Sequence, residues 1–226
     1  MGRHFIVCIL STIVLCSCGS TKSMTYLQKT STDSVVTAAK AQEIKLQPYD
    51  KISIVVSSRD PKLSALFNLP AVSGTVGNND SVSVNGVAKY TVDGKGNIDF
   101  PVIGSLSVAG LSRDSISKMI KRRLADGQLL ADCVVTVEFV NLGLSVLGEV
   151  NAPGRYSIDR DCITILDAIS MAGDITRHGN RRKVTVMRTE DGVQKSYTLN
   201  LLSAEDALSS PAYYLRQNDI VYVSNK

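Results

Sequence analysis

Turns rich in glycine, proline and asparagine recur at short intervals along the sequence, and they constrain the fold more than any other feature. They cut the chain into short alternating segments typical of strands and a few segments with helical periodicity. The turns are at residues 85–86, 93–96, 151–154 and 190–192. Hairpins interleaved with single capped helices are typical of an α+β fold. We therefore predict an α+β protein whose folded part consists of two small domains.

The first predicted domain covers residues 44–141. The turn at residues 48–50 precedes a strand pattern, and Asp60 followed by Pro61 is the signature of a helix N-terminus. Ser112 is expected to cap a second helix with an apolar face of Ile116, Met119, Ile120 and Leu124. In order, the predicted elements are a strand over 52–56, a short helix ending near residue 68, a hairpin around 85–86, a turn at 93–96, a helix from Ser112 ended by Gly127, and a strand over 133–140.

The second predicted domain covers residues 142–226. Two extended runs flank the turn at 151–154, where Pro153 sets φ and Gly154 is expected to take a positive φ. Thr164 and Asp167 have the spacing of a capping box, and Gly173 is expected to stop that helix. Three further strands are predicted over residues 183–189, 193–199 and 219–223.

The N-terminus is typical of an export signal. The apolar run over residues 5–15 is about half of the 20 residues that a transmembrane helix needs. A basic start, an apolar middle and small residues at 16–17 predict a signal peptide over residues 1–17. The end of this segment, Leu15 to Cys18, resembles the bacterial lipobox, which makes Cys18 the predicted site of lipidation. An ordinary signal peptide cut nearby is the alternative, and it would release a soluble protein.

The remaining bulk features restrict the classes of function. Residues 18–43 are rich in Ser, Thr, Lys and Gln and are interpreted as a flexible tether with a reach of roughly 25 to 30 Å. A net charge of +4 without a basic stripe interleaved with aromatics does not predict nucleic-acid binding. No Cys or His cluster has the spacing of a metal site. Cys133 and Cys162 either form a disulfide or stay as two separate thiols.

These landmarks together resemble the outer-membrane polysaccharide export lipoproteins, through which bacteria secrete capsule and exopolysaccharide. Residues 46–54 and 90–111 are similar to two signatures of the polysaccharide export domain, although the glycine usual beside Pro48 is missing. The second domain resembles a soluble ligand-binding β-grasp (SLBB) domain. The matching residues to which we assign structural roles are Pro48, Asp50, Asp93, Gly96, Pro101, Gly104, Gly148, Glu149, Pro153, Gly154, Tyr156 and Gly173.

The resemblance implies a ring-shaped homo-oligomer that forms a periplasmic conduit for polysaccharide. It also implies a lipid anchor in the outer membrane, a body facing the periplasm, and an inner-membrane co-polymerase partner that regulates chain length. The glycines and prolines are expected to fix turns. Asp50 is interpreted as a turn acceptor rather than a glycan contact. No cofactor, metal or catalytic residue is expected.

Family members that are better known end in an amphipathic helix that crosses the outer membrane. This sequence ends three residues after its last predicted strand, and no segment after Cys18 is long enough to span a bilayer as a helix. The lipid is therefore the only membrane attachment that we predict. One β-grasp domain is expected, where some relatives have two.

Enzymatic function is not predicted. The only histidine after the signal peptide, His178, lies in a loop, and no G-x-S-x-G or H-E-x-x-H motif is present. Glycosidases need a pair of carboxylates at a set spatial separation, which a sequence does not give; Asp159 and Asp161 flank a predicted turn. Aromatic residues make up only 5% of the chain, few for sugar stacking. A non-transporting periplasmic glycan-binding or scaffold lipoprotein is the alternative function.

Overall fold

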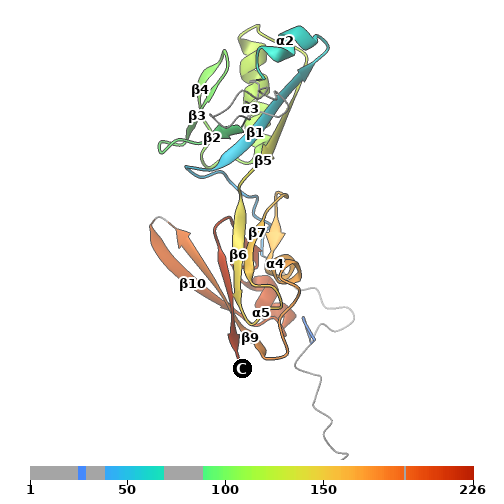
Figure 1. Cartoon of the computed structure of the whole chain (residues 1–226), viewed down its shortest axis with the longest axis vertical. Helices are drawn as coiled ribbons and strands as arrows, with labels where there is room; N and C mark the ends of the chain where they lie inside the picture. Colours follow the sequence, from blue (N-terminus) through green and yellow to red (C-terminus); the bar gives the residue numbers. More distant parts are fainter. Residues whose placement is uncertain (1–24, 29–38, 69–88, 191) are drawn as a thin grey trace, which may run out of the picture.

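The computed structural model describes residues 25–28, 39–68, 89–190 and 192–226. Figure 1 shows two lobes joined end to end, the first holding β1 to β5 and the second holding the elements from β6 onward. Both lobes combine helices with sheets, so the predicted α+β fold is confirmed. The signal peptide, Cys18 and the hairpin predicted around residues 85–86 lie outside the described residues.

The first lobe is built on a three-stranded antiparallel sheet in the order β2-β1-β5. A hairpin, β3 with β4, and two helices complete the lobe, and α3 packs against β5. The elements are β1 (Lys51–Ser58), α2 (Pro61–Ala65), β2 (Lys89–Thr91), β3 (Asn97–Phe100), β4 (Gly104–Ser107), α3 (Arg113–Asp126) and β5 (Cys133–Phe139).

The helix boundaries in this lobe follow from local chemistry. Asp60 accepts a hydrogen bond from the Lys62 amide at 2.9 Å, and Ser112 accepts from Ser115 at 3.4 Å, so both predicted N-caps are confirmed. The predicted face of α3 is buried at Ile116, Ile120 and Leu124, while Met119 lies half-buried at its edge. Gly127 ends α3 with a φ of −77°. The left-handed turn is taken one residue later, at Gln128.

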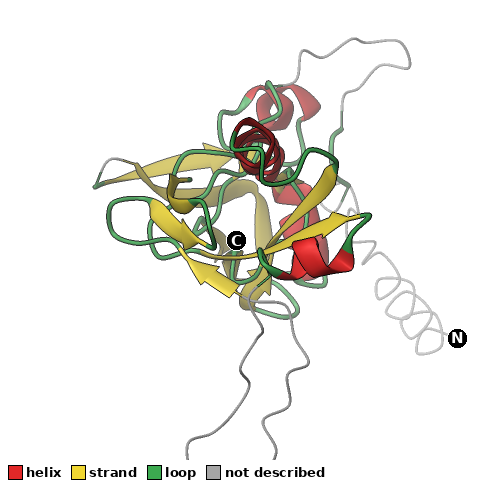
Figure 2. Ribbon diagram, turned by 90° about the horizontal axis from the view of Figure 1, so that it is seen from above, coloured by secondary structure: helices red, strands yellow, loops and turns green. Residues whose placement is uncertain are grey.

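The second lobe is built on a five-stranded sheet in the order β10-β9-β12-β6-β7 (Figure 1). The β12–β6 pair is parallel and the other pairs are antiparallel. Figure 2 looks along the long axis of the molecule, so the two lobes lie one behind the other in that view. The elements are β6 (Gly143–Gly148), β7 (Gly154–Ser157), β8 (Ile163–Thr164), α4 (Ile165–Met171), β9 (Gly179–Glu190), β10 (Val193–Leu199), α5 (Ala204–Ser209), β11 (Tyr214–Leu215) and β12 (Ile220–Asn225).

One prediction for the turns of this lobe is wrong. Gly154 does not take a positive φ; the glycine of this region that does is Gly148, at 89°. Gly154 is the first residue of β7 and pairs with Val146 of β6, so it lies in a strand rather than in the turn. At Gly148 a glycine is also required by close packing, because a Cβ there would lie 2.1 Å from the carbonyl oxygen of Val223. The capping box of Thr164 and Asp167 is confirmed, and α4 stops before Gly173 as predicted. Helix α5 and the β8–β11 pair were not predicted.

Parts of the predicted tether are attached to the second lobe. The Leu27 amide donates to Leu201 at 2.9 Å, and the Ala39 amide donates to Leu208 at 2.7 Å. The ring of Tyr26 packs against the hydrophobic core, with the Arg181 guanidinium carbon 5.2 Å from its centroid. The composition gave no sign of these contacts, since they depend on residues more than 150 positions away. In the described part of the chain, the helices are too short or too polar to cross a bilayer.

The two cysteines that the structure describes are unpaired. Cys133 is buried in β5 and Cys162 is half-buried before β8. Burial raises the pKa of both thiols, which keeps them protonated and unreactive. Of the two alternatives left by the sequence, the structure therefore has the separate thiols.

Candidate functional site at the domain junction

Two segments distant in sequence meet where the lobes join. The first, residues 39–50, leads into β1; the second, residues 216–219, links β11 to β12. The first segment contacts both lobes. The Ile44 amide donates to the backbone carbonyl of Asp161 at 2.8 Å, and the Leu46 amide donates to the backbone carbonyl of Leu111 at 3.0 Å. We call the region formed by the two segments the junction.

Asp50 connects the two segments. It is buried, and its Oδ2 accepts hydrogen bonds from the Gln47 amide and from Nε2 of Gln217, each at 2.7 Å. The first bond closes the turn before β1, as expected for a turn aspartate. The second crosses between the lobes. Burial raises the pKa of Asp50, although the two hydrogen bonds act in the opposite direction.

The loop over residues 216–219 is held by a buried ion pair. Arg188 in β9 donates from Nε to Oδ1 of Asp219 at 2.9 Å and from Nη2 to Oδ2 at 2.7 Å, and both side chains are at most 3% exposed. Asp219 also accepts from the Arg216 amide at 2.8 Å. Burial lowers the pKa of Arg188, but the hydrogen bond and charge of Asp219 outweigh it and raise the pKa overall. The Arg188 guanidinium therefore stays charged.

The next residues of the loop face the first lobe. Asn218 has a left-handed backbone, with a φ of 63°, which turns the chain toward residues 47–50. Its Oδ1 accepts from Arg155 at 3.2 Å. Gln217 is 4% exposed, and its Oε1 has no hydrogen-bond partner among the described residues. A buried acceptor without a hydrogen bond lowers the stability of the fold, so a donor that reached this oxygen would stabilise the junction.

A second connection between the lobes runs through Arg113 at the start of α3. Its Nε donates to Asp161 at 2.7 Å and its Nη1 donates to Glu138 at 2.6 Å. The guanidinium carbon also lies 4.8 Å from the ring centroid of Phe139. The hydrogen bond to Asp161 is the main cause that raises the pKa of Arg113. Because Asp161 belongs to the second lobe, this side chain links the two lobes with a charged contact.

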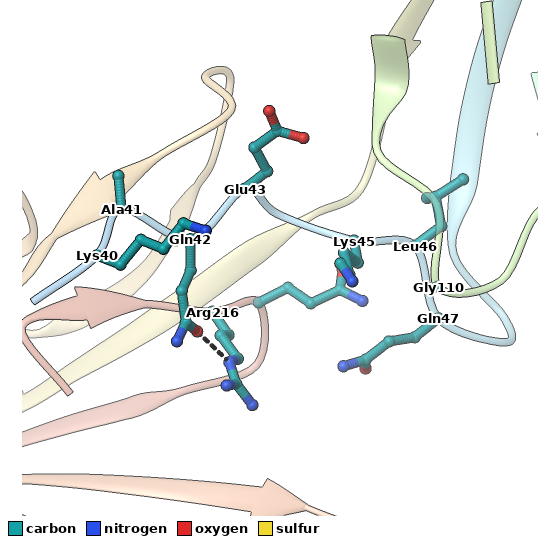
Figure 3. Close-up of a pocket in the computed structure, with 10 residues that line it drawn as sticks. Lys40, Ala41, Gln42, Glu43, Lys45, Leu46, Gln47, Gly110 and Arg216 are labelled. Atoms are coloured by element: carbon teal, nitrogen blue, oxygen red, sulfur yellow. Dashed lines mark hydrogen bonds between the residues drawn. The ribbon is translucent and has the colours of Figure 1, made fainter. Parts of the chain in front are cut away.

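Two cavities flank the junction, with volumes of about 770 Å³ and 460 Å³. They share Gln47, Arg216 and Gln217, so we treat them as one groove, called the junction groove. Figure 3 shows the larger cavity, with Gln42 hydrogen-bonded to Arg216 and Gln47 reaching in from the other end of the segment. Apolar and polar groups both line it, and the amide, ammonium and guanidinium groups among them are suited to hydrogen bonding and ion pairing. The described residues hold no group of His, Cys, Asp or Glu arranged for a metal.

Few of the residues singled out from the sequence lie at the junction. Asp50 does, and Pro48 lies in its turn. Asp93 accepts from the Lys95 and Asn97 amides, each at 2.8 Å, in the turn before β3. Gly96 in that turn has a φ of 88°, and a Cβ on it would lie 2.6 Å from that of Ala109. The remaining two in this lobe, Pro101 and Gly104, form the turn between β3 and β4.

The predicted residues of the second lobe gather at the end of β6 that is farther from the junction. Glu149 accepts from Oγ1 of Thr176 at 2.8 Å. The carbonyl of Gly173 accepts from Nδ2 of Asn151 at 2.5 Å, which ties the end of α4 to the turn after Gly148. Pro153 and Gly154 lead into β7, and the hydroxyl of Tyr156 donates to the Ala152 carbonyl. These contacts are within the fold and line neither cavity of the junction groove.

Sequence reasoning missed most of the junction. One signal was present: Arg188 occupies the inward-facing register of β9 together with Val184 and Val186, and a charge in that register requires a buried partner. Another was Asn218, since asparagine tolerates the left-handed conformation better than most residues. Neither signal identifies the partner, because the contacts join residues far apart in the chain.

Comparison with known proteins agrees with this two-domain architecture. Residues 38–140 match the family described as polysaccharide biosynthesis/export protein, and residues 143–223 match the SLBB domain. The fold and these matches define a two-domain α+β protein with an export domain followed by an SLBB domain. The chain belongs to the polysaccharide biosynthesis/export family.

The chain is also similar to two proteins whose names state a role. The chain is 30% identical over 217 residues to the EPS I polysaccharide export outer membrane protein EpsA of Ralstonia nicotianae, covering 92% of this chain and 54% of that protein. It is 29% identical over 189 residues to the protein of the same name from Ralstonia solanacearum, covering 82% and 48%. The chain therefore spans about half the length of these relatives.

The buried carboxyl of Asp50 gives a testable pH dependence. Since its pKa is raised above 3.8 on folding, the folded protein binds this proton more tightly than the unfolded chain does. Ionisation of Asp50 therefore costs stability as pH rises from the unfolded pKa through the folded one. Asp50→Asn has no such ionisation. We expect the free energy of unfolding of the variant, relative to the wild type, to increase across this window and then level off. A constant or falling difference in denaturant titrations would contradict the assignment.

Proposed function

We propose that this protein is a non-enzymatic outer-membrane lipoprotein of a polysaccharide export machine. In this proposal it forms a ring-like homo-oligomer that serves as a periplasmic conduit for capsular polysaccharide or exopolysaccharide. The observation that carries the proposal is the ordered pair of domains, export then SLBB, over residues 38–140 and 143–223. The names of the two relatives support both the export role and the outer membrane as its location.

The contacts of residues 25–28 suggest how the body is oriented. Tyr26 lies eight residues after Cys18, and its hydroxyl donates to Asp174 in the second lobe. Burial is the main cause that raises the pKa of Tyr26 to about 12, so the hydroxyl remains a donor. Eight extended residues reach at most about 28 Å. A lipid on Cys18 therefore holds the second lobe near the membrane and leaves the first lobe toward the inner-membrane co-polymerase that we propose as its partner.

The proposal is tested by deleting the gene and measuring polysaccharide on the cell surface, together with the native mass of the detergent-extracted protein. We expect surface polysaccharide to fall to the background level and the native mass to be that of an oligomer. Normal surface polysaccharide together with a monomeric mass would contradict the export ring. That result would instead support a periplasmic glycan-binding or scaffold lipoprotein.

The lipid anchor is tested by Cys18→Ala. We expect the variant to lose its association with the outer membrane in cell fractionation, because it lacks the sulfur that carries the proposed lipid. Cys8→Ala is the matched control, since it makes the same substitution in the segment that the signal peptidase removes. Association that persists equally in both variants would contradict lipidation at Cys18.

A further inference from the structure

The junction groove has features of a ligand site that its role in joining the lobes does not require. Its larger cavity, at about 770 Å³, lies within the range of roughly 300 to 1,000 Å³ that is typical of small-molecule sites. Three glutamines line it, Gln42, Gln47 and Gln217. Primary amides carry both donors and acceptors, so they match hydroxyl groups, which also act as both.

Some charged side chains of the groove have ion-pair partners and others do not. Arg188 is neutralised by Asp219, and Glu190 is paired with Arg216 and Lys195. Lys40 and Lys45 are exposed, line the larger cavity, and form no ion pair or hydrogen bond with other described residues. Figure 3 shows the carboxylate of Glu43 pointing away from the hydrogen-bonded pair of Gln42 and Arg216. Glu43 also lines the larger cavity and has no ion-pair partner among the described residues, so two lysines stand against one carboxylate and the net unpaired charge of the groove is positive.

One hydrogen-bond donor of the Arg216 guanidinium is unused. Its Nε donates to Gln42 at 3.0 Å and its Nη1 donates to Glu190 at 2.7 Å, which leaves Nη2 without a partner among the described residues. The guanidinium is thus held in place by two neighbours while one edge stays available. A fixed guanidinium edge of this kind is well suited to a carboxylate.

Gln217 supplies the independent sign of a missing partner. Its amide lines both cavities, its Nε2 is fixed by Asp50, and its Oε1 is buried and unpaired among the described residues. An oxygen in this state gains most from a hydroxyl donor, because it has no water to lose.

We propose that the junction groove binds an anionic oligosaccharide segment. Lys40, Lys45 and the free edge of Arg216 pair with its carboxylates, and the glutamine amides, including Oε1 of Gln217, bond to its hydroxyls. This inference rests on the proposed export function and narrows its substrate to an acidic polysaccharide. None of the described residues that line the groove is aromatic, so recognition by these residues depends on charge and hydrogen bonds.

The test uses the full chain purified in detergent and titrated by calorimetry with trigalacturonate, and with maltotriose as the neutral probe. We expect trigalacturonate to bind, and to bind about tenfold more tightly than maltotriose. Added salt should weaken the binding of trigalacturonate only. Each of Lys40→Met and Lys45→Met should weaken it about three- to fivefold, and the double variant about tenfold. Lys62→Met, an exposed lysine on α2 that lines neither cavity, is the matched control and should leave binding unchanged.

A second variant tests the hydrogen-bonding half of the proposal. Gln47→Ala removes an exposed amide and should keep the fold, which a thermal unfolding curve verifies. We expect the variant to bind trigalacturonate severalfold more weakly than the wild type does. Absence of binding, equal affinity for the two sugars, or equal affinity in the double lysine variant and the Lys62→Met control would overturn the inference. The gene deletion result is independent of all three outcomes. Lost surface polysaccharide without trigalacturonate binding would therefore remove this inference and leave the proposed function intact.

Discussion

Arg188→Met is expected to lower the free energy of unfolding by about 3–5 kcal/mol, because it leaves a buried carboxylate without its partner. Asp219 is only 1% exposed and receives two hydrogen bonds from the Arg188 guanidinium at 2.9 Å or less. The remaining donor to it, the Arg216 amide, does not neutralise a charge. Methionine keeps much of the volume of the arginine stem, so the loss reports the charge rather than a cavity. Equilibrium denaturation in urea measures it.

The matched control is Arg59→Met, which breaks an ion pair of the same type at the surface. Arg59 and Asp132 are 3.3 Å apart, with side chains 93% and 75% exposed. Exposed pairs contribute little because water screens them, so we expect no measurable change in stability. Equal losses in the two variants would contradict the assignment of Arg188 and Asp219 as the fixed centre of the loop over residues 216–219.

Gly148→Ala is expected to lower the free energy of unfolding by about 3 kcal/mol, which combines the cost of a left-handed backbone with that of overpacking. The φ of Gly148 is 89°, and an added Cβ would lie 2.1 Å from the carbonyl oxygen of Val223. This oxygen belongs to β12, the parallel partner of β6, and accepts from the Glu149 amide at 2.9 Å. The alanine must therefore separate two central strands of the sheet.

Gly104→Ala separates the two contributions. Gly104 has nearly the same φ, 84°, but no heavy atom in the described part of the chain lies within 4 Å of a Cβ added there. The free energy of unfolding of Gly104→Ala should therefore fall only by the cost of the left-handed backbone, about 1 kcal/mol. A loss at Gly148 no larger than the loss at Gly104, measured in the same denaturant titrations, would contradict the close contact between β6 and β12.

Local features of the fold were predictable from the sequence. Asp60, Ser112 and Thr164 each cap a helix through a hydrogen bond that spans at most three residues, so the residue types and their spacing are sufficient. Strand alternation likewise predicted β1, β5 and β9. The same reasoning failed at Gly154, because strand β7 already begins at this residue, which pairs with Val146 of β6.

The junction was not predictable for the same physical reason. Gln217 and Asp50 are 167 positions apart, and Arg113 and Asp161 are 48 apart. Neither residue of such a pair has a local pattern that names its partner. The separate thiols of Cys133 and Cys162 are a further case, because a disulfide depends on the distance between two cysteines, which the sequence does not give. Family resemblance found the two domains, whereas the structure was needed to find the groove between them.

The junction matters for the proposed conduit because it sets the relative position of the two lobes. Charged contacts at Arg113 and the buried hydrogen bond between Asp50 and Gln217 hold that position from two places. A ligand in the junction groove would contact both lobes at once.

The most direct test of the central claim is the distribution of polysaccharide in a strain that lacks the gene, measured separately on the cell surface and inside the outer membrane. An export component moves the polymer without making it. We therefore expect the surface fraction to fall to background while polymer accumulates inside, and a plasmid copy of the wild-type gene to restore the surface fraction. An unchanged surface fraction in the deletion strain would contradict the proposed export function.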